Sequence, residues 1–357
     1  MDEREAMNLA LDLAWQGWGR VHPNPLVGAV VLAGGVVVGE GWHAEFGDRH
    51  AEPIALDQAG ERASGGTLVV SLEPCAHRGK QPPCIDAIIR AGIRRVVAAV
   101  GDPNPTAAGG ADRLRAAGIE VEIGLLGHLA AAQNAAFLHG FRVPSRPFVA
   151  LKLATSLDGR IADAAGRSRW ISGREAQEYV HWLRAGYDAV AVGGRTARTD
   201  DPQLTVRGSV EPRNPPRRVV FDPQADLDPD LTLVRTARRT PTLLVTSPAA
   251  PDQRVEQLAA CGVTILPAES LADGLRSLRR AGVGSLLVEG GGRLAGALLG
   301  EEMADRYYWL QSPIWLGERG VPAIAGLPSQ PLDRAARWRP VERRALGEDT
   351  LLVVDRD

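Results

Sequence analysis

The amino-acid sequence predicts an α/β protein with two domains. The chain has 357 residues, of which 45% are hydrophobic, and this length suffices for two ordinary domains. Short Val-rich runs alternate along the chain with helical stretches that end in glycine, a pattern typical of layered α/β domains. The chain contains no apolar run approaching the ~20 residues of a membrane span, so we expect no membrane association.

The first half predicts a three-layer α/β domain. Residues 1–19 begin with acidic side chains and predict an amphipathic helix. Two Val-rich runs around Ala-Gly-Gly predict a hairpin over residues 25–42. Further strands are expected at 66–74, 94–102 and 118–124, and helices at 84–92 and 111–118.

A proline-containing segment marks the expected domain boundary. We expect a helix from residue 130 that breaks at Gly140, ahead of the prolines at 144 and 147. We therefore place the first domain at residues 1–144 and the second at residues 145–357.

The second domain repeats the alternation and predicts a mostly parallel, doubly wound sheet, with its ligand crevice at the carboxyl ends of the strands. Its expected strands are 147–154, 188–194, 217–222, 241–247, 262–266, 284–290 and 306–313. Its expected helices are 174–186, 254–262, 271–282 and 293–300.

Charge and cysteine content exclude several classes of protein. The formal net charge is -2, which argues against a broad nucleic-acid interface, because binding to phosphate backbones needs a marked excess of cations. Three cysteines are too few for a disulfide framework. The acidic start of the chain lacks the basic leader of a secretory signal, so we expect a cytoplasmic protein. We also expect it to form a homo-oligomer.

Two of the three cysteines lie in one loop and point to metal chemistry. Cys75 and Cys84 each follow a proline in SLEPCAHRGKQPPC, and His50 and Glu52 stand upstream in His-x-Glu spacing. Zinc is commonly held by one imidazole and two thiolates, and a catalytic site leaves the fourth position to water. We interpret His50, Cys75 and Cys84 as zinc ligands and Glu52 as the acid/base that carries protons between water and a departing amine.

The order of these residues is that of zinc-dependent deaminases of nucleobases. Taken singly, a His-x-Glu pair is more often a solvated helix start, and a cysteine beside proline is more often a buried apolar residue. Their joint occurrence favours the metal site. The spacing departs from the common Pro-Cys-x-x-Cys, since residues 76–83 separate the two thiols.

Longer motifs resemble a known family. HPNPLVGAVV (22–31), HAE (50–52), LEPCAHRGKQPPC (72–84) and GDPNP (101–105) closely resemble the deaminase half of the bifunctional riboflavin-biosynthesis deaminase-reductases. LKLATSLDGRIA (151–162), SRWISG (168–173), DDPQLTVR (200–207) and VEGGG (288–292) resemble the reductase half. The resemblance implies a cytidine-deaminase-like α/β/α domain followed by a dihydrofolate-reductase-like α/β domain.

The resemblance also implies two consecutive reactions. A zinc-dependent hydrolytic deamination of a diaminopyrimidinone ribosyl phosphate is followed by an NADPH-dependent reduction of the ribosyl group to ribityl. The resemblance thus implies a small phosphorylated pyrimidine as the substrate.

Carried over by matching position, the family's site residues fall into groups. The pyrimidine and phosphate pocket would be lined by Asn24, His43, His77 and Lys80. In the reductase half, the substrate positions would be Ser168, Arg184, Leu204, Arg207 and Glu289. The NADPH positions would be Ala154, Trp170, Thr196, Asp200, Gly290, Gly291, Gly292 and Arg293. The triple glycine lies between a strand and a helix, where backbone N–H groups can approach a phosphate; alone it indicates only a tight turn.

Some positions depart from the family pattern, and two rival hypotheses remain open. Ala76 and Gln81 replace Ser and Thr in the cysteine loop, Pro223 stands where a hydroxyl residue contacts the cofactor, and Pro53 follows Glu52. One rival is a nucleoside or tRNA-base deaminase with an unrelated appended domain. The other is a catalytically dead, zinc-stabilised scaffold, for which Glu52 would be dispensable.

Overall fold

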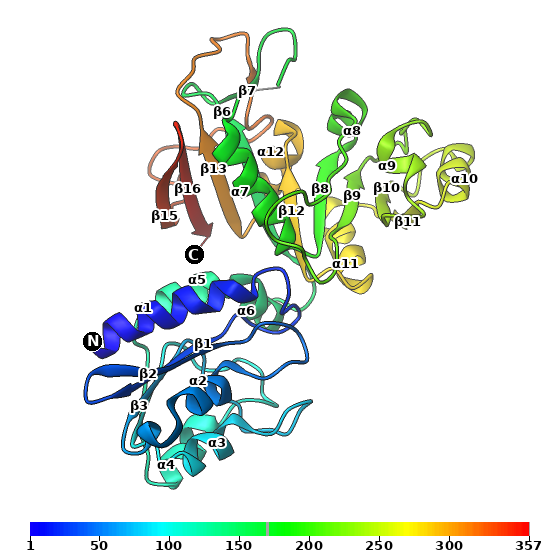
Figure 1. The fold of residues 1–357 in the computed structure, drawn as a ribbon. Coiled ribbons are helices and arrows are strands. Elements are labelled where there is room, and N and C mark those ends of the chain that lie inside the picture. The colour runs from blue at the N-terminus through cyan, green and yellow to red at the C-terminus, as the bar shows by residue number, and fades with distance from the viewer. Residues whose placement is uncertain (169–170, 357) are drawn as a thin grey trace. The chain divides into compact units, whose positions relative to one another are not determined.

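The computed structural model describes residues 1–168 and 171–356, which form two compact units (Figure 1). Unit 1 comprises Met1–Arg142 with Glu211–Arg213, and unit 2 comprises Val143–Val210 with Asn214–Asp357. Within the described residues, we find no helix with the length and apolar character needed to cross a bilayer.

The described residues of unit 1 form a five-stranded sheet in the order β2-β1-β3-β4-β5. The strands are β1 (Gly28–Ala33), β2 (Val36–Trp42), β3 (Thr67–Val70), β4 (Arg95–Ala98) and β5 (Glu120–Ile123). The antiparallel pairing of β1 with β2 confirms the expected hairpin. β1 is also antiparallel to β3, whereas β3, β4 and β5 run parallel. The loops that follow β3 and β4 therefore begin at the same edge of the sheet.

Helices cover both faces of this sheet. They are α1 (Glu3–Ala14), α2 (Ala51–Ala59), α3 (Cys84–Arg90), α4 (Gly110–Ala116), α5 (Gly127–Gln133) and α6 (Ala135–Arg142), with short 3-10 turns at Trp15–Gly17 and Gly60–Ala63. On β1, Val30 and Leu32 pack in one core with side chains of α1 and α5. Ala29 and Val31 pack in a second core with side chains of α2, α3 and α4. This alternation, which follows from the period of two in a strand, produces the expected three layers.

The expected helix break at Gly140 is wrong. α6 continues through Gly140 to Arg142, and the interruption lies at Asn134, between α5 and α6. The buried side chain of Asn134 accepts a hydrogen bond from the backbone N–H of Leu26 at 2.8 Å and donates one to its carbonyl at 2.9 Å. A tertiary contact with a distant segment, rather than the glycine, therefore sets the break.

The described residues of unit 2 form a nine-stranded sheet in the order β11-β10-β9-β8-β12-β6-β13-β16-β15. The strands are β6 (Phe148–Thr155), β8 (Ala189–Gly193), β9 (Arg217–Phe221), β10 (Thr242–Thr246), β11 (Thr264–Pro267), β12 (Ser285–Glu289), β13 (Arg306–Gln311), β15 (Trp338–Leu346) and β16 (Asp349–Arg356). β7 (Arg160–Ala162) and β14 (Val321–Pro322) form a separate pair. Pairing is parallel from β11 to β13 and antiparallel at β16 and β15, which confirms a mostly parallel sheet.

Helices also cover both faces of the larger sheet. They are α7 (Arg174–Ala185), α8 (Gly194–Asp200), α9 (Thr232–Arg235), α10 (Asp252–Ala260), α11 (Leu271–Arg280) and α12 (Gly292–Gly300). Leu275 of α11 and Leu298 of α12 belong to one hydrophobic core. Leu233 of α9 and Leu258 of α10 belong to a second. No sequence pattern predicted α8, α9, β7, β14 or the terminal hairpin of β15 and β16.

Candidate active sites in the two units

His50, Cys75 and Cys84 converge in unit 1. His50 is the N-cap of α2, Cys84 is the first residue of α3, and Cys75 lies in the loop after β3. The Nδ1 atom of His50 is 3.2 Å from the sulfur of Cys84 and 3.6 Å from that of Cys75. The three donor atoms all lie within 4.8 Å of one another. One imidazole nitrogen and two sulfurs at this separation form the donor set that zinc prefers, so the residues present fit a zinc ion.

Local packing holds the three donors together. The start of α2 lies so close to β2 that a Cβ added at Gly41 would be 2.3 Å from the carbonyl oxygen of Ala51, beside His50. The backbone N–H of Cys84 points to the sulfur of Cys75 at 3.4 Å. Hydrogen bonds from Cys84 and from His50 lower the pKa of the Cys75 thiol to about 4, although its burial raises it. A thiolate at Cys75 is the form that binds a metal.

Glu52 lies beside this cluster in the first turn of α2. Its side chain is buried, at 3% exposure, and its Oε2 atom has no hydrogen-bond partner among the described residues. Burial raises the pKa of Glu52, and His50 opposes that shift. An unpartnered buried carboxyl oxygen is costly, which is consistent with a group that exchanges protons with a bound ligand.

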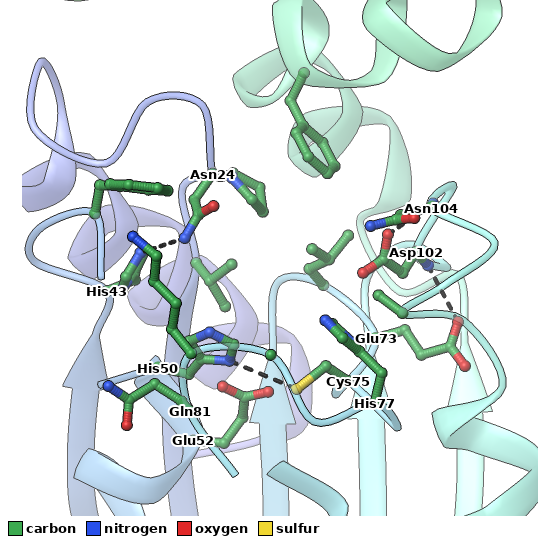
Figure 2. A pocket seen from close by; sticks show the side chains of 18 of the residues that line it. Asn24, His43, His50, Glu52, Glu73, Cys75, His77, Gln81, Asp102 and Asn104 are labelled. Carbon is green, nitrogen blue, oxygen red and sulfur yellow. Dashed lines mark hydrogen bonds between the residues drawn. The ribbon is translucent and has the colours of Figure 1, made fainter. Parts of the chain in front are cut away.

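A cavity of about 240 Å³ opens over the cluster; we call it the unit 1 cavity (Figure 2). Asn24, His43, His77 and Lys80, which were expected at the pyrimidine and phosphate pocket, all line it. It also contains groups for which the sequence analysis assigned no role, notably Phe46, Glu73, Asp102, Asn104 and Phe137.

The histidine at position 43 has a defined orientation. Its Nδ1 is 3.0 Å from the carbonyl oxygen of Arg49, and its Nε2 is 3.1 Å from Nδ2 of Asn24. Because a carbonyl only accepts, Nδ1 carries the proton, and Nε2 of the neutral ring accepts from the Asn24 amide. Burial lowers the pKa of His43, which favours this neutral form. The pair thus directs the Asn24 carbonyl oxygen away from His43.

Unit 2 contains a cavity of about 1170 Å³, which we call the unit 2 cavity. Arg184 and Glu289 both line it, and the Arg184 side chain forms two hydrogen bonds with the Glu289 carboxylate, at 2.6 and 2.8 Å. Lys152 of β6 pairs in register with Glu289 of β12. Burial would raise the pKa of Glu289, but Arg184 and Lys152 lower it overall; burial lowers the pKa of Lys152, and Glu289 opposes that shift. Glu289 is therefore a carboxylate at neutral pH.

The glycines after β12 form the wall of this cavity next to α12. Gly290 and Gly291 have φ values of +71° and +82°, a conformation that favours glycine. A Cβ added at Gly292 would be 2.5 Å from the carbonyl oxygen of Pro322. All three glycines line the cavity at the start of α12, where backbone N–H groups can bind a phosphate. This glycine loop and the volume of the unit 2 cavity together fit a dinucleotide.

Comparison with known proteins decides the family. Residues 147–352 match the RibD C-terminal domain, and residues 1–100 match the cytidine and deoxycytidylate deaminase zinc-binding region. The riboflavin biosynthesis protein RibD of Aquifex aeolicus is 40% identical over 357 residues, which cover 99% of this chain and 98% of that protein. The chain belongs to the RibD family of riboflavin biosynthesis proteins. It is a bifunctional enzyme, a zinc-dependent deaminase joined to an NADPH-dependent reductase.

Solved structures of RibD proteins agree along the whole chain. RibD of Acinetobacter baumannii, form 1, superposes with a TM-score of 0.82 at 35% identity and covers 99% of this chain and 98% of its own. A Thermotoga maritima protein superposes with a TM-score of 0.83 at 35% identity and covers 99% of both chains. That protein is described as a diaminohydroxyphosphoribosylaminopyrimidine deaminase/5-amino-6-(5-phosphoribosylamino)uracil reductase. Full-length similarity excludes the hypothesis of an unrelated appended domain.

The structure brings most of the RibD-derived reductase positions to the unit 2 cavity. Its lining includes Ala154, Ser168, Arg184, Thr196, Asp200, Leu204, Glu289, Gly290, Gly291, Gly292 and Arg293. Among the described residues that line it, Arg207 is absent; its backbone N–H donates to Nδ1 of His181 at 3.1 Å. Trp170, expected at the cofactor, lies outside the described residues. Pro223, one of the departures from the family pattern, does line the cavity.

Proposed function

We propose that residues 1–144 deaminate a diaminopyrimidinone ribosyl phosphate and that residues 145–357 then reduce the ribosyl group of the aminouracil to ribityl. The proposal is supported by the substrates in the description of the Thermotoga maritima relative and by the presence of one cavity in each unit. The observation on which it chiefly rests is the convergence of His50, Cys75 and Cys84 beside the unpartnered carboxyl of Glu52.

In the deaminase, His50, Cys75 and Cys84 hold the metal. Zinc at such a site lowers the pKa of water to about 7 and so supplies hydroxide at neutral pH. The net reaction replaces a ring amino group by oxygen: a C–O bond forms, the C–N bond breaks and ammonia leaves. Glu52 takes a proton from the water at its Oε2 and delivers it to the departing nitrogen. Its burial excludes bulk solvent from that exchange.

The remaining unit 1 cavity residues bind the substrate. Asn24, oriented by His43, uses its side-chain oxygen to accept from the pyrimidine ring. The ammonium of Lys80, 3.9 Å from the centre of the Phe46 ring, and the imidazole of His77 bind the phosphate.

In the reductase, the glycine loop, with Ala154, Thr196, Asp200 and Arg293, positions the cofactor. NADPH supplies the hydride. The substrate lies against Ser168, Leu204 and the Arg184–Glu289 pair. Because Glu289 stays charged, it accepts hydrogen bonds from ribosyl hydroxyls and holds the sugar beside the nicotinamide.

The direct test supplies the purified zinc-loaded chain with the diaminopyrimidinone ribosyl phosphate, with and without NADPH. We expect ammonia release in both cases and NADPH oxidation only after ammonia has been released. Absence of ammonia release would refute the deaminase assignment. Ammonia release without any NADPH oxidation would refute the reductase assignment. The scaffold hypothesis predicts neither product.

We place the enzyme in the cytoplasm as a homo-oligomer. The cytoplasmic location is supported by its free cysteines, Cys75, Cys84 and Cys261, which a reducing compartment preserves. Light scattering of the purified chain measures its oligomeric state. A mass of 38.0 kDa, that of one chain, would contradict the homo-oligomer.

A further inference from the structure

Glu73 connects the cysteine loop of unit 1 to a second wall of the same cavity. It follows β3, stands two residues before Cys75 and is 9% exposed. Its Oε2 accepts a hydrogen bond from the backbone N–H of Asp102 at 3.1 Å (Figure 2), and its Oε1 accepts one from the N–H of Ala111 at 2.9 Å. Among the described residues, no cation forms an ion pair with this carboxylate. One side chain thus holds both ends of the loop from 101 to 110.

That loop presents polar groups to the unit 1 cavity, which Asp102 and Asn104 line together with Glu52 and Cys75. One oxygen of each side chain stabilises the loop itself: Oδ1 of Asp102 accepts from the N–H of Asn104 at 2.9 Å, and Oδ1 of Asn104 accepts from the N–H of Thr106 at 3.1 Å. Among the described residues, no hydrogen bond engages the second carboxylate oxygen of Asp102 or the Nδ2 of Asn104, so both can bind a ligand.

Other contacts bring the end of this loop against the cysteine loop. The N–H of Ala76 donates to the carbonyl of Ala107 at 3.1 Å, and Arg113 donates to the carbonyl of Ala76 at 2.7 Å. A Cβ added at Gly110 would be 1.8 Å from the carbonyl oxygen of Pro74. The position of the loop relative to Cys75 is therefore defined closely, and Glu73 is the side chain that reaches both of its ends.

We propose that Glu73 is a positioning residue of the deaminase, which fixes Asp102 and Asn104 at the distance from Cys75 and Glu52 that orients the pyrimidine ring. This inference rests on the proposed deamination. A buried carboxylate without a cation is expensive, and such a group would be replaceable by an apolar one if it served packing alone. Displacing a substrate-orienting wall by about 1 Å can cost about 10²-fold in rate.

The test is Glu73→Gln in the full, zinc-loaded chain. The amide has one acceptor oxygen, and its NH₂ group faces a second N–H donor, so one end of the loop is released. We expect kcat for ammonia release to fall about 10²-fold, while zinc content and NADPH oxidation with the aminouracil intermediate stay at the wild-type values. The Tm should fall only modestly, because one buried N–H loses its acceptor. Asp112→Asn is the matched control: it removes an exposed carboxylate from the same turn of α4, where Asp112 bonds Arg115, and should change none of these quantities.

A double-mutant cycle separates positioning from general stability. If Glu73 acts through the loop, Glu73→Gln should slow the Asp102→Ala protein clearly less than it slows the wild type, because one of the two side chains that Glu73 positions is already absent. If the fold-decrease in kcat of the double variant equals the product of the two single fold-decreases, the inference is overturned. A wild-type kcat in Glu73→Gln would overturn it too, as would a loss of activity proportional to loss of zinc. If the wild-type chain itself releases no ammonia, the proposed function has failed. If the wild type is active and Glu73→Gln releases ammonia at the wild-type rate, only the inference about Glu73 is contradicted.

Discussion

The two cavities each contain a buried carboxyl group, and the two groups have opposite surroundings. Glu52 in unit 1 has an oxygen without any hydrogen-bond partner among the described residues, and burial raises its pKa. Glu289 in unit 2 is bonded through both oxygens to Arg184, and its pKa is lowered. The first setting favours a carboxyl that gains and loses a proton, whereas the second favours one that stays charged and binds. We therefore propose that the same residue type serves hydrolysis in one unit and substrate binding in the other.

The largest expected effect is at Glu52. Glu52→Gln keeps the shape of the side chain but removes the proton acceptor, so ammonia release should fall by about 10²–10⁴-fold. Metal analysis of the purified variant should find the wild-type zinc content, because His50, Cys75 and Cys84 are intact. NADPH oxidation with the aminouracil intermediate should be unchanged. Normal ammonia release by the variant would show that Glu52 does not carry the proton, and would contradict the proposed mechanism.

The next effect is expected at Arg184. Arg184→Met leaves the Glu289 carboxylate buried without its main partner, which should lower the free energy of unfolding by about 3–5 kcal/mol and reduce NADPH oxidation by about 10²-fold. Denaturant unfolding and steady-state kinetics measure the two quantities.

Arg306→Met is the matched control for Arg184→Met. Arg306 forms a buried pair with Asp355, with hydrogen bonds of 2.6 and 2.9 Å, and it is absent from the described residues that line the unit 2 cavity. It should destabilise the chain similarly, yet the folded variant should keep its reductase kcat. Equal kinetic losses in both variants would mean that the Arg184 effect reflects stability alone.

A smaller effect is expected in the glycine loop. A Cβ at Gly291 would be 3.1 Å from the Thr196 hydroxyl, whereas one at Gly290 would be 3.9 Å from the nearest atom, Cγ2 of the same threonine. Both residues have positive φ, so each alanine adds about 1 kcal/mol of backbone strain. Gly291→Ala should therefore raise the Kd for NADPH about tenfold. Gly290→Ala should raise it less, since only the methyl group at position 291 also displaces Thr196. Fluorescence titration with NADPH in the absence of substrate measures the Kd of each variant. Equal Kd values for the two variants would exclude an effect of the Gly291→Ala methyl group on Thr196.

The smallest effect concerns pH. Because the pKa of Glu289 is lowered in the folded chain, the unfolded chain binds more protons between that pKa and the unfolded value of about 4.3. The stability due to Glu289 is thus complete above the unfolded pKa and is lost as pH falls through the folded one. The difference in unfolding free energy between wild type and Glu289→Gln should be constant near neutrality and shrink on acidification. A difference that grows in acid would mean that the folded pKa is raised.

Much of the fold was predictable because buried strands consist of Val-rich runs. β15 was missed because it is an edge strand with mostly exposed, arginine-rich residues, and α8 because GRTARTD has no apolar period. The helix break was placed wrongly because a glycine is visible in the sequence, whereas the contact between Asn134 and Leu26 is not.

In the candidate sites, residues that stand in short sequence motifs were predicted. Contacts that depend on the register of paired strands were not. His50, Glu52, Cys75 and Cys84 stand in recognisable spacings, and the structure brings them together. The proximity of Lys152 to Glu289 arises from the parallel pairing of β6 with β12, which no local pattern shows. The role inferred for Glu73 likewise depends on the meeting of loops after two adjacent parallel strands.

The most direct test of the contrast between the two carboxyls measures both activities in both variants. Zinc-loaded Glu52→Gln and Glu289→Gln are each assayed for ammonia release from the diaminopyrimidinone ribosyl phosphate and for NADPH oxidation with the deaminated intermediate. We predict that Glu52→Gln loses only ammonia release and that Glu289→Gln loses only NADPH oxidation. Loss of both activities in one folded variant, or of neither, would contradict the assignment of separate chemistry to the two cavities.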